Sequence, residues 1–365
     1  MVTNTLARGG AEAMLVRLAL ALNPEHVRPV VVCLKEAGIW AEPLKERGIP
    51  VYERQLRHKF DVGVIHRLSH LVRRYEPACL LAVGSGGDRM FWSTLAGWRM
   101  KVPVIVWSHI FPSPGRLAFE WVNRRLYGHV DAFVALGEQH REALVALEGV
   151  PADRVTVIRN GIDVDGFDGE GDRAAVRAEL GAAADDVVVG IVANLRPDKR
   201  HDVFVKAAAQ VRLARPATRF VIIGDGPERG KVQQMVAACD PDGVFLRMLG
   251  ERGDVRTLMQ GLDVVCLTSE WQECLSVVML EAMAAGKTFV APRVGSLDEA
   301  LIDGVTGRFF GPLRADALAA VLIELVDDAE QRQSLGVRAR DRVREEFTAM
   351  RMAQHFTSLV LGLCR

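Results

Sequence analysis

Short apolar runs alternate with amphipathic stretches along the whole chain. In the first half, the runs predict buried strands, and the stretches between them repeat their apolar positions at helical spacing. This alternation is typical of parallel sheets joined by crossover helices. The expected strands are Val30–Leu34, Cys79–Val83, Val104–Trp107, Ala132–Leu136 and Val155–Ile158, and the expected helices are Ala11–Leu22, Val62–Tyr75, Met90–Trp98, Arg116–Tyr127 and Glu138–Leu147.

The second half repeats the scheme and ends in a long helical pattern over residues 314–364. We expect the last part of this pattern to cross back onto the first half of the chain. The expected strands are Val187–Ala193, Phe220–Ile223, Val244–Leu246, Val264–Thr268 and Phe289–Ala291, and the expected helices are Asp202–Arg212, Arg229–Ala238, Asp254–Gln260 and Val277–Ala285.

A segment rich in Gly and Asp, residues 160–173, separates the halves and is typical of a linker. For 365 residues, two domains are expected. We predict an α/β protein of two Rossmann-like doubly wound domains facing a cleft, with ligands at the carboxyl ends of the strands. The domains would span residues 1–160 and 161–345, and residues 346–365 would form the returning helix. Only Met1–Thr5 remains for a first strand, which is therefore expected to be a stub or to be clipped.

Charge and composition narrow the class of protein. Lys and Arg number 46, Asp and Glu also number 46, and hydrophobic residues make up 49%, which excludes disorder and argues against a nucleic-acid partner. Residues 1–160 nevertheless hold 21 basic and 15 acidic side chains, a net charge of +6, and the remainder carries −6. This asymmetry leaves two explanations open, which are chance and an anionic acceptor or membrane surface facing the first half.

The cysteines and the apolar runs bear on location. The six cysteines are scattered without a C-x-x-C pair, which favours reduced thiols over a zinc site or disulfides. The chain contains no apolar run of about 18 residues, and its first residues contain no apolar signal core. We expect a cytoplasmic protein, either free or peripheral at the inner face of a membrane.

The strongest chemical signal is a pair of carboxylates, Glu273 and Glu281, that follows an expected strand and enters an expected helix. Eight positions of helix would separate them by about 12 Å. That exceeds the spacing of a glycosidase pair, about 5–9.5 Å, and suits two contacts with one long ligand. The helix N-terminus between them favours phosphate. From spacing alone, two solvated glutamates remain an equal alternative.

The segment 268–310, TSEWQECLSVVMLEAMAAGKTFVAPRVGSLDEALIDGVTGRFF, resembles the donor-binding region of retaining glycosyltransferases of the GT-B fold, group 1 / family 4 type. Further elements follow in the order of that family. They are the loop around Gly9 and Gly10, the strand ending in His109, the text VIRNGID at 157–163, the text VANLRPDK at 192–199 and the text IGDGP at 223–227. Five elements in the right order are much more specific than any one of them.

The resemblance implies a role for each matching residue. Glu281 would accept hydrogen bonds from ribose hydroxyls, Glu273 would lie by the transferred sugar, and Lys199 would neutralise the leaving phosphate. The backbone N–H groups of Ser276 and Val277 would hold the diphosphate. The other implied positions are Gly9 and Gly10 at the diphosphate, His109 at the sugar, Gly250 in a loop that reads the base, and Glu299, which is either near the diphosphate or simply on the surface.

Departures from the family pattern leave some roles open. Cys274 and Leu275 replace the usual Gly and Phe beside the sugar. The phosphate-binding Arg of the family falls at Asn194, so Arg196 either reaches the phosphate from a shifted position or is a surface residue. Asp163 and Asp165 resemble an Asp-x-Asp metal site of another fold, but they lie in the linker, and no metal or other cofactor is expected.

The resemblance implies transfer of a sugar from a nucleoside diphosphate sugar to a hydroxyl of a carbohydrate or glycolipid acceptor, with retention of configuration, in cell-surface polysaccharide or glycolipid synthesis. Two alternatives remain: another enzyme of the same architecture, such as a nucleotide-sugar epimerase, and a non-catalytic relative that binds a sugar nucleotide.

Overall fold

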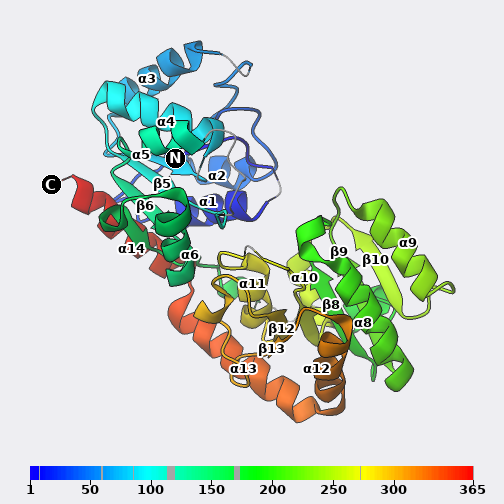
Figure 1. Ribbon diagram of the computed structural model, residues 1–365. Helices are drawn as coiled ribbons and strands as arrows, with labels where there is room; N and C mark the ends of the chain where they lie inside the picture. Colours follow the sequence, from blue (N-terminus) through cyan, green and yellow to red (C-terminus); the bar gives the residue numbers. More distant parts are fainter. Residues whose placement is uncertain are drawn as a thin grey trace. The chain divides into compact units, whose positions relative to one another are not determined.

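The computed structural model divides the chain into two compact units (Figure 1). Unit 1 comprises Met1–Ile162 together with Phe347–Arg365, and unit 2 comprises Asp163–Glu346. The structure describes the whole chain except residues 8, 59–60, 85, 113–119, 168–172, 272 and 365, together with the side chains of 120–123. Each unit is built on a parallel sheet with helices packed against it, as the alternation of strand and helix predicts.

The sheet of unit 1 has seven strands in the order β3-β2-β1-β4-β5-β6-β7, and every neighbouring pair is parallel. The order runs in opposite directions on the two sides of the β1/β4 boundary, which makes this boundary the topological switch point where open α/β sheets bind ligands. The strands are β1 (Val2–Thr3), β2 (Val31–Cys33), β3 (Val51–Tyr52), β4 (Leu80–Val83), β5 (Val104–Trp107), β6 (Ala132–Ala135) and β7 (Val155–Val157).

The stub expected at the start is a strand in the middle of the sheet. Strand β1 pairs on one side with β2, through Val2 and Val32, and on the other with β4, through Val2 and Ala82. Val2 and Thr3 are 2% and 0% exposed. Two residues hold this central place because both of their edges are hydrogen-bonded and both faces are covered.

The helices of unit 1 follow the predicted periodicity, with shifted ends. The last predicted helix is shorter and continues into one wide helical turn at Leu144–Glu148. Helix α2 and strand β3 were missed because six- and two-residue elements show no clear period, and residues 116–119 of one predicted helix lie outside the described residues. The helices are α1 (Gly10–Ala21), α2 (Ala41–Glu46), α3 (Gly63–Tyr75), α4 (Gly87–Met100), α5 (Glu120–Tyr127), α6 (Glu138–Ala143) and α14 (Ala349–Leu363).

The sheet of unit 2 has six parallel strands in the order β10-β9-β8-β11-β12-β13, so its switch point lies between β8 and β11. The strand expected at Val244–Leu246 instead begins at Leu246 and extends to Gly250. The sequence also missed helix α7 and strand β13. The strands are β8 (Val187–Val192), β9 (Thr218–Ile223), β10 (Leu246–Gly250), β11 (Val264–Cys266), β12 (Thr288–Pro292) and β13 (Arg308–Phe310). The helices are α7 (Arg173–Glu179), α8 (His201–Ala214), α9 (Arg229–Cys239), α10 (Val255–Gly261), α11 (Val277–Ala284), α12 (Ala315–Asp327) and α13 (Ala329–Glu346).

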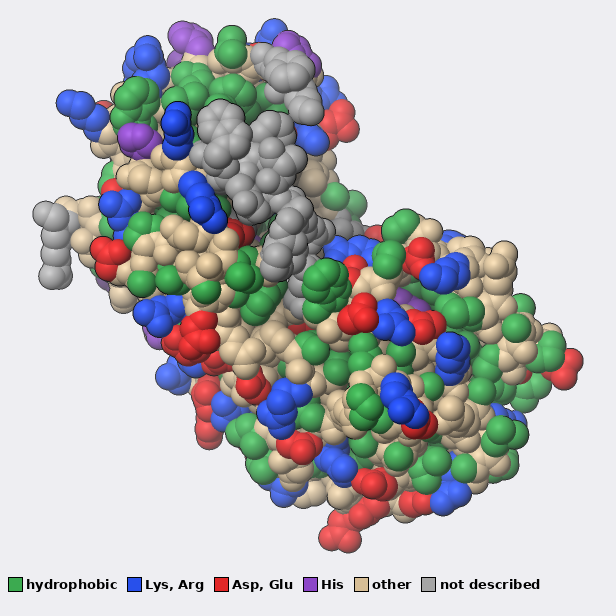
Figure 2. Space-filling model, in the orientation of Figure 1, with side chains coloured by type: hydrophobic (Ala, Val, Ile, Leu, Met, Phe, Trp, Pro, Cys, Tyr) green, Lys and Arg blue, Asp and Glu red, His purple; other side chains and the backbone are tan. Residues whose placement is uncertain are grey.

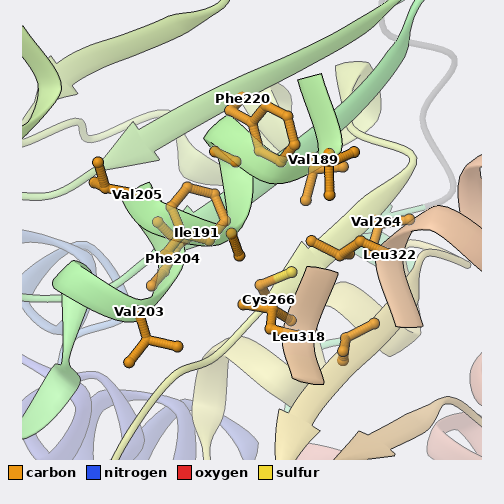
Figure 3. Close-up of a cluster of buried hydrophobic side chains, with 14 of the residues drawn as sticks. Val189, Ile191, Val203, Phe204, Val205, Phe220, Val264, Cys266, Leu318 and Leu322 are labelled. Carbon is orange, nitrogen blue, oxygen red and sulfur yellow. The ribbon is translucent and has the colours of Figure 1, made fainter. Parts of the chain in front are cut away.

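A continuous apolar core fixes the sheet of unit 2 against two of its helices (Figure 3). Phe204 of α8 meets Phe220 of β9 with ring centroids 5.9 Å apart, edge to face. Cys266 of β11 and Leu318 of α12 are fully buried in the same cluster. This packing gives the loops that follow β8 and β11 a rigid base.

The expected linker contains the boundary between the units, and its first residues are structured. Ile162 forms a bridge with Thr348, which brings the start of α14 to the end of the first long segment. Helix α14 then packs against α1, and Phe356 meets Trp107 of β5 with ring centroids 4.8 Å apart. The final helix therefore belongs to unit 1, although the chain has passed through the whole of unit 2 first.

The surface differs between the units on the face drawn in Figure 2. Among the ionisable side chains visible there, Lys, Arg and His predominate over Asp and Glu on unit 1, whereas acidic and basic side chains are interspersed on unit 2. This agrees with the opposite net charges of the two halves of the sequence. Within the described residues, no helix combines the length and the apolar character needed to span a bilayer.

Candidate functional site

The switch point of unit 2 gathers charged and hydroxyl side chains from two neighbouring loops. Lys199 lies in the helical turn after β8, and Glu273 and Ser269 lie in the loop after β11. Lys199 Nζ contacts Glu273 Oε1, and it lies 3.3 Å from Ser269 Oγ. Ser269 Oγ in turn donates to Glu273 Oε1 at 2.6 Å. The three side chains form one closed network at the edge where ligands bind in this kind of sheet.

The backbone ties the two loops together beneath this network. The Thr268 hydroxyl donates to the carbonyl of Lys199 at 2.7 Å, and the N–H of Glu270 donates to the carbonyl of Asp198 at 3.0 Å. Thr268 and Ser269 are fully buried. Lys199 and Glu273 are therefore held in place by the sheet rather than by long mobile segments.

A glycine fixes the position of Glu273. The carbonyl of Glu273 accepts a hydrogen bond from the N–H of Ser296 at 2.9 Å, and Gly295 passes directly beside it. Gly295 has a φ of +55°, and a Cβ atom added there would lie 1.8 Å from the Glu273 oxygen. Only glycine fits this turn, because any side chain would push the Glu273 backbone away.

Ser276 caps the helix that follows. Its hydroxyl accepts from the N–H of Met279 at 3.3 Å, and α11 begins at Val277. The first N–H groups of a helix have no acceptor within it, so this end of α11 is suited to bind an anion. The separation of about 12 Å estimated for Glu273 and Glu281 assumed helix throughout. That assumption is wrong, because residues 273–276 precede α11 and only Glu281 lies in it.

Arg196 does not stand free for a phosphate in this structure. Its guanidinium forms two hydrogen bonds with the carboxylate of Asp198, at 2.9 and 2.6 Å, and this pairing raises the pKa of Arg196. The Arg196 side chain is 47% exposed. Asp198 therefore competes with any phosphate for Arg196, which was not apparent from the sequence.

The remaining positions predicted in unit 2 are less directly connected to the network. Gly250 ends β10, has its carbonyl bonded to the N–H of Gly224 at 2.8 Å, and lines a pocket of about 310 Å³. Arg252 in the same loop pairs with Glu179 and Asp254. Glu299 is the last residue of a helical turn, and its backbone carbonyl accepts a hydrogen bond from Arg342 Nη2 at 3.0 Å.

His109 and the two early glycines lie in unit 1. His109 follows β5, and its ring is 4.4 Å from that of Trp107. Burial, and then the charge of Arg89, lowers the pKa of His109 to about 3, so its imidazole is neutral at physiological pH. Gly9 is the extended N-cap of α1, and Gly10 is the first residue of that helix. Glu12 folds back over Gly9, because a Cβ added there would lie 2.3 Å from Glu12 Oε2.

Sequence reasoning missed several residues around these positions. Ser269 opens the same motif as Glu273, so its place in the text was a usable signal. His201 is 3% exposed, and burial, assisted by the charge of Lys199, lowers its pKa to about 4. Neither ring nitrogen of His201 has a hydrogen-bond partner among the residues that the structure describes. Nothing in the sequence around His201 indicates this burial.

The Asp-x-Asp pair of the linker has another environment. Asp163 forms an ion pair with Arg256 at 3.6 Å. Among the described residues, no group of three or more His, Cys, Asp or Glu side chains is arranged to hold a metal ion.

Comparison with known families matches both units. Residues 172–342 match the model of glycosyl transferases group 1, and residues 8–165 match that of glycosyltransferase family 4. The chain belongs to the group 1 / family 4 glycosyltransferases. The range 172–342 falls within unit 2 and contains the donor-region motif, and the range 8–165 covers most of the first segment of unit 1 and ends three residues past it.

Solved structures of glycosyltransferases share the fold. HepE of Anabaena, solved with UDP and glucose, has a TM-score of 0.87 at 22% identity and covers 99% of this chain and 98% of its own. WaaG, a glycosyltransferase involved in lipopolysaccharide biosynthesis, has a TM-score of 0.75 at 14% identity and covers 99% of this chain and 100% of its own. The predicted GT-B fold, with two Rossmann-like domains, is confirmed.

Curated relatives are glycosyltransferases as well. The D-inositol 3-phosphate glycosyltransferase of Nocardia farcinica is 30% identical over 268 residues, covering 68% of this chain and 58% of the relative. The enzyme of the same name from Mycobacterium sp. (strain KMS) is 32% identical over 191 residues, covering 51% of this chain and 42% of the relative. The chain thus spans about half the length of the curated relatives it matches.

Proposed function

We propose that this glycosyltransferase moves a sugar from a nucleoside diphosphate sugar to an acceptor hydroxyl with retention of configuration. The observation that carries the proposal is the Lys199–Ser269–Glu273 network at the switch point of unit 2, directly before the N-terminus of α11. A cation beside an anion-binding helix end suits a diphosphate. The complexes of HepE with UDP and with UDP-glucose give this donor class a precedent in a protein of the same fold.

The donor is expected to lie along the loop after β11 and the start of α11. The N–H groups of Ser276 and Val277 would bind the diphosphate, and Glu281, one turn into the helix, would accept from the ribose hydroxyls. Glu273, in the loop before the helix, would contact the sugar, as the resemblance to the family implies. Gly250 and its pocket would take part in reading the base.

Charge stabilisation is the main chemical task of these residues. As the bond between the anomeric carbon and the phosphate oxygen breaks, negative charge grows on the diphosphate, and Lys199 and the end of α11 stabilise it. The acceptor oxygen forms its bond to the same face of the anomeric carbon, and the acceptor proton passes to the departing phosphate. This route needs no metal and no covalent intermediate on a carboxylate.

The acceptor side is less defined than the donor side. His109 would contact the sugar as a neutral imidazole, and Gly9 and Gly10 would allow close approach of the diphosphate. We propose a carbohydrate or glycolipid acceptor in cell-surface polysaccharide or glycolipid synthesis. The protein would be cytoplasmic, with the basic surface of unit 1 available for contact with an anionic membrane. The name of the Nocardia relative adds D-inositol 3-phosphate to the acceptors that should be assayed.

The test has two stages. A thermal-shift panel of UDP, GDP and ADP and their glucose, mannose and N-acetylglucosamine derivatives identifies the donor, because ligand binding raises the unfolding temperature. The donor that binds is then incubated with a lipid extract and with soluble acceptors, including D-inositol 3-phosphate. Proton NMR of the product reads the anomeric configuration.

Retention of the donor configuration supports the proposal, and inversion contradicts the mechanism. Release of an epimerised donor without transfer would make the protein an epimerase instead. Binding without turnover by any acceptor would identify a non-catalytic relative. If Lys199 takes part in the transfer, Lys199→Ala should slow it. Lys231→Ala is the matched control, since Lys231 is an exposed lysine of the same unit and pairs with Glu228 at 2.9 Å.

A further inference from the structure

The switch point of unit 1 contains a second group of charged and polar side chains. Glu12 lies in the first turn of α1, after β1, and Arg89 lies in the first turn of α4, after β4. His109 follows β5, the next strand in the sheet. Glu12 acts electrostatically on Arg89, and Arg89 acts in the same way on His109. Three adjacent strands thus bring these side chains to one edge.

Arg89 is a cation without a partner. Within the part of the chain that the structure describes, its guanidinium forms no ion pair, and its Nε atom is buried with no hydrogen-bond acceptor. Burial lowers the pKa of Arg89, and the charges of Glu12 and Asp88 only partly oppose this. A half-buried guanidinium whose buried Nε has no acceptor and whose charge has no partner reduces the stability of the fold.

The backbone around Arg89 is shaped to keep it there. A Cβ atom added at Gly84, which has a φ of +110°, would lie 2.4 Å from both Cζ and Nε of Arg89. The N–H of Gly84 bonds to the carbonyl of Trp107 at 2.6 Å, which places this glycine next to the end of β5. The guanidinium therefore packs directly against Gly84, at a position that no side chain could share.

His109 presents a second unsatisfied atom at the same edge. Its Nε2 is buried and has no partner among the described residues. The carboxylate of Glu12, which acts on Arg89, folds back over Gly9. Two unpartnered nitrogens from adjacent strands thus lie near the N-terminal ends of α1 and α4, where helix dipoles add positive potential.

We propose that Arg89, assisted by His109, binds an oxyanion group of the acceptor, either a phosphate ester or a carboxylate. The proposal rests on the proposed glycosyl transfer and specifies its acceptor class. A guanidinium offers parallel N–H donors that match the two oxygens of such a group. An incoming oxyanion would supply the missing counter-charge, and the low local dielectric would strengthen the contact.

The first experiment observes Arg89 directly. Arginine Nε–H resonances of the full chain are recorded while inorganic phosphate, and separately acetate, is added, and the Arg89 signal is assigned by its loss in Arg89→Gln. We expect the Arg89 signal to shift in a saturable manner with at least one anion. Because the signal belongs to one residue, phosphate bound near Lys199 does not interfere. An Arg89 signal unmoved by both anions would overturn the proposal.

The control substitution lies on the same helix. Arg99→Gln removes an exposed arginine near the end of α4, and its anion response should equal that of the unsubstituted protein. Arg89→Gln should retain the thermal midpoint or raise it, since it removes an unpaired, half-buried cation. A marked fall in the midpoint would instead assign Arg89 a purely structural role and contradict the proposal.

The second experiment measures transfer to a matched pair of acceptors that differ only in the anionic group, in phosphate and carboxylate versions. Arg89→Gln should raise KM for the anionic acceptor by about tenfold or more and leave KM for the neutral one unchanged. Donor affinity should not change. A loss of donor affinity in Arg89→Gln would place Arg89 in the donor site and refute the acceptor assignment. If the unsubstituted protein bound no donor at all, the proposed transfer would be refuted, but the anion titration of Arg89 would still test the present proposal.

Discussion

The two sheets reverse their strand order at equivalent places, but the two switch points hold their charges differently. In unit 2, Lys199, Ser269 and Glu273 satisfy one another. In unit 1, Arg89 has no ion-pair partner among the described residues, and the nearby Nε2 of His109 has no hydrogen-bond partner there. A closed network stabilises the empty protein and must rearrange or share its hydrogen bonds when a ligand binds. An open one costs stability until a ligand arrives, so the same topology yields a preformed site in one unit and an incomplete one in the other.

Removing Lys199 should show the largest effect of this difference. Lys199→Ala should lower turnover by about 10²–10³, since one charge-stabilising donor is lost. It should also lower the free energy of unfolding by about 3 kcal/mol, because Glu273 is left buried without its cation. Steady-state kinetics and urea unfolding measure the two effects. Normal turnover with the donor bound would exclude Lys199 from catalysis, and Lys231→Ala should change neither quantity.

Substitution of Gly295 tests whether the network depends on the turn beneath it. Gly295→Ala should destabilise unit 2 by about 3 kcal/mol, since both the positive φ and the contact with the Glu273 carbonyl oppose a side chain. Gly304→Ala is the matched control: its φ is +70°, but a Cβ there meets open space. It should cost only about 1 kcal/mol. Equal losses for the two variants would mean that the close approach to Glu273 does not matter.

Glu281 tests the donor contact beyond the network. Glu281→Ala should weaken nucleotide binding by about 10- to 100-fold, because hydrogen bonds to a charged group are worth about 1.5–3 kcal/mol. Calorimetric titration with the nucleotide selected by the thermal-shift panel measures this. Glu281→Gln keeps one acceptor oxygen, so its nucleotide affinity should lie between those of the unsubstituted protein and Glu281→Ala. An unchanged nucleotide affinity in Glu281→Ala would show that the ribose does not bind at Glu281.

Lowering the pH should destabilise both units for the same reason, which is the burial of a neutral histidine. Burial lowers the pKa of His140 in unit 1 and of His201 in unit 2 to about 4 each. The unfolded chain binds protons at these residues below its ordinary pKa of about 6.5, whereas the folded chain does so only near 4, so stability falls as pH falls through this window. Each histidine should cost about 1 kcal/mol between pH 7 and 5.5.

His201→Leu should remove its share of this acid loss, whereas the exposed His355→Leu should leave the loss intact. Urea unfolding at pH 7 and pH 5.5 measures the difference between the two variants. An identical pH dependence in His201→Leu and in the unsubstituted protein would show that folding does not lower the pKa of His201.

The smallest expected effect is none. Excess chelator should leave transfer unchanged, because Lys199 and the end of α11 perform the charge stabilisation in the proposed mechanism. A loss of activity restored by a divalent cation would contradict this and direct attention to Asp163 and Asp165.

The sequence predicted the strand–helix alternation and the family motifs well, since both are local patterns. It did not predict how the motifs pair with one another. The link between Lys199 and Ser269 joins residues 70 positions apart, and Arg196 is occupied by Asp198, two positions away, in a turn without a periodic signal. Arg89 escaped notice because its character comes from the absence of partners, which depends on the packing of three strands.

The route of the chain has a consequence for how the protein is made. Unit 2 is one continuous segment, whereas unit 1 needs α14, whose Phe356 packs on Trp107 and is 2% exposed. On the ribosome, the second-made unit is complete first, and the first-made unit must wait for the last helix to leave the exit tunnel. In nascent chains stalled before residue 347, unit 1 should therefore be incompletely folded, because the ring of Trp107 lacks Phe356. A protease should cleave unit 1 of these chains before unit 2.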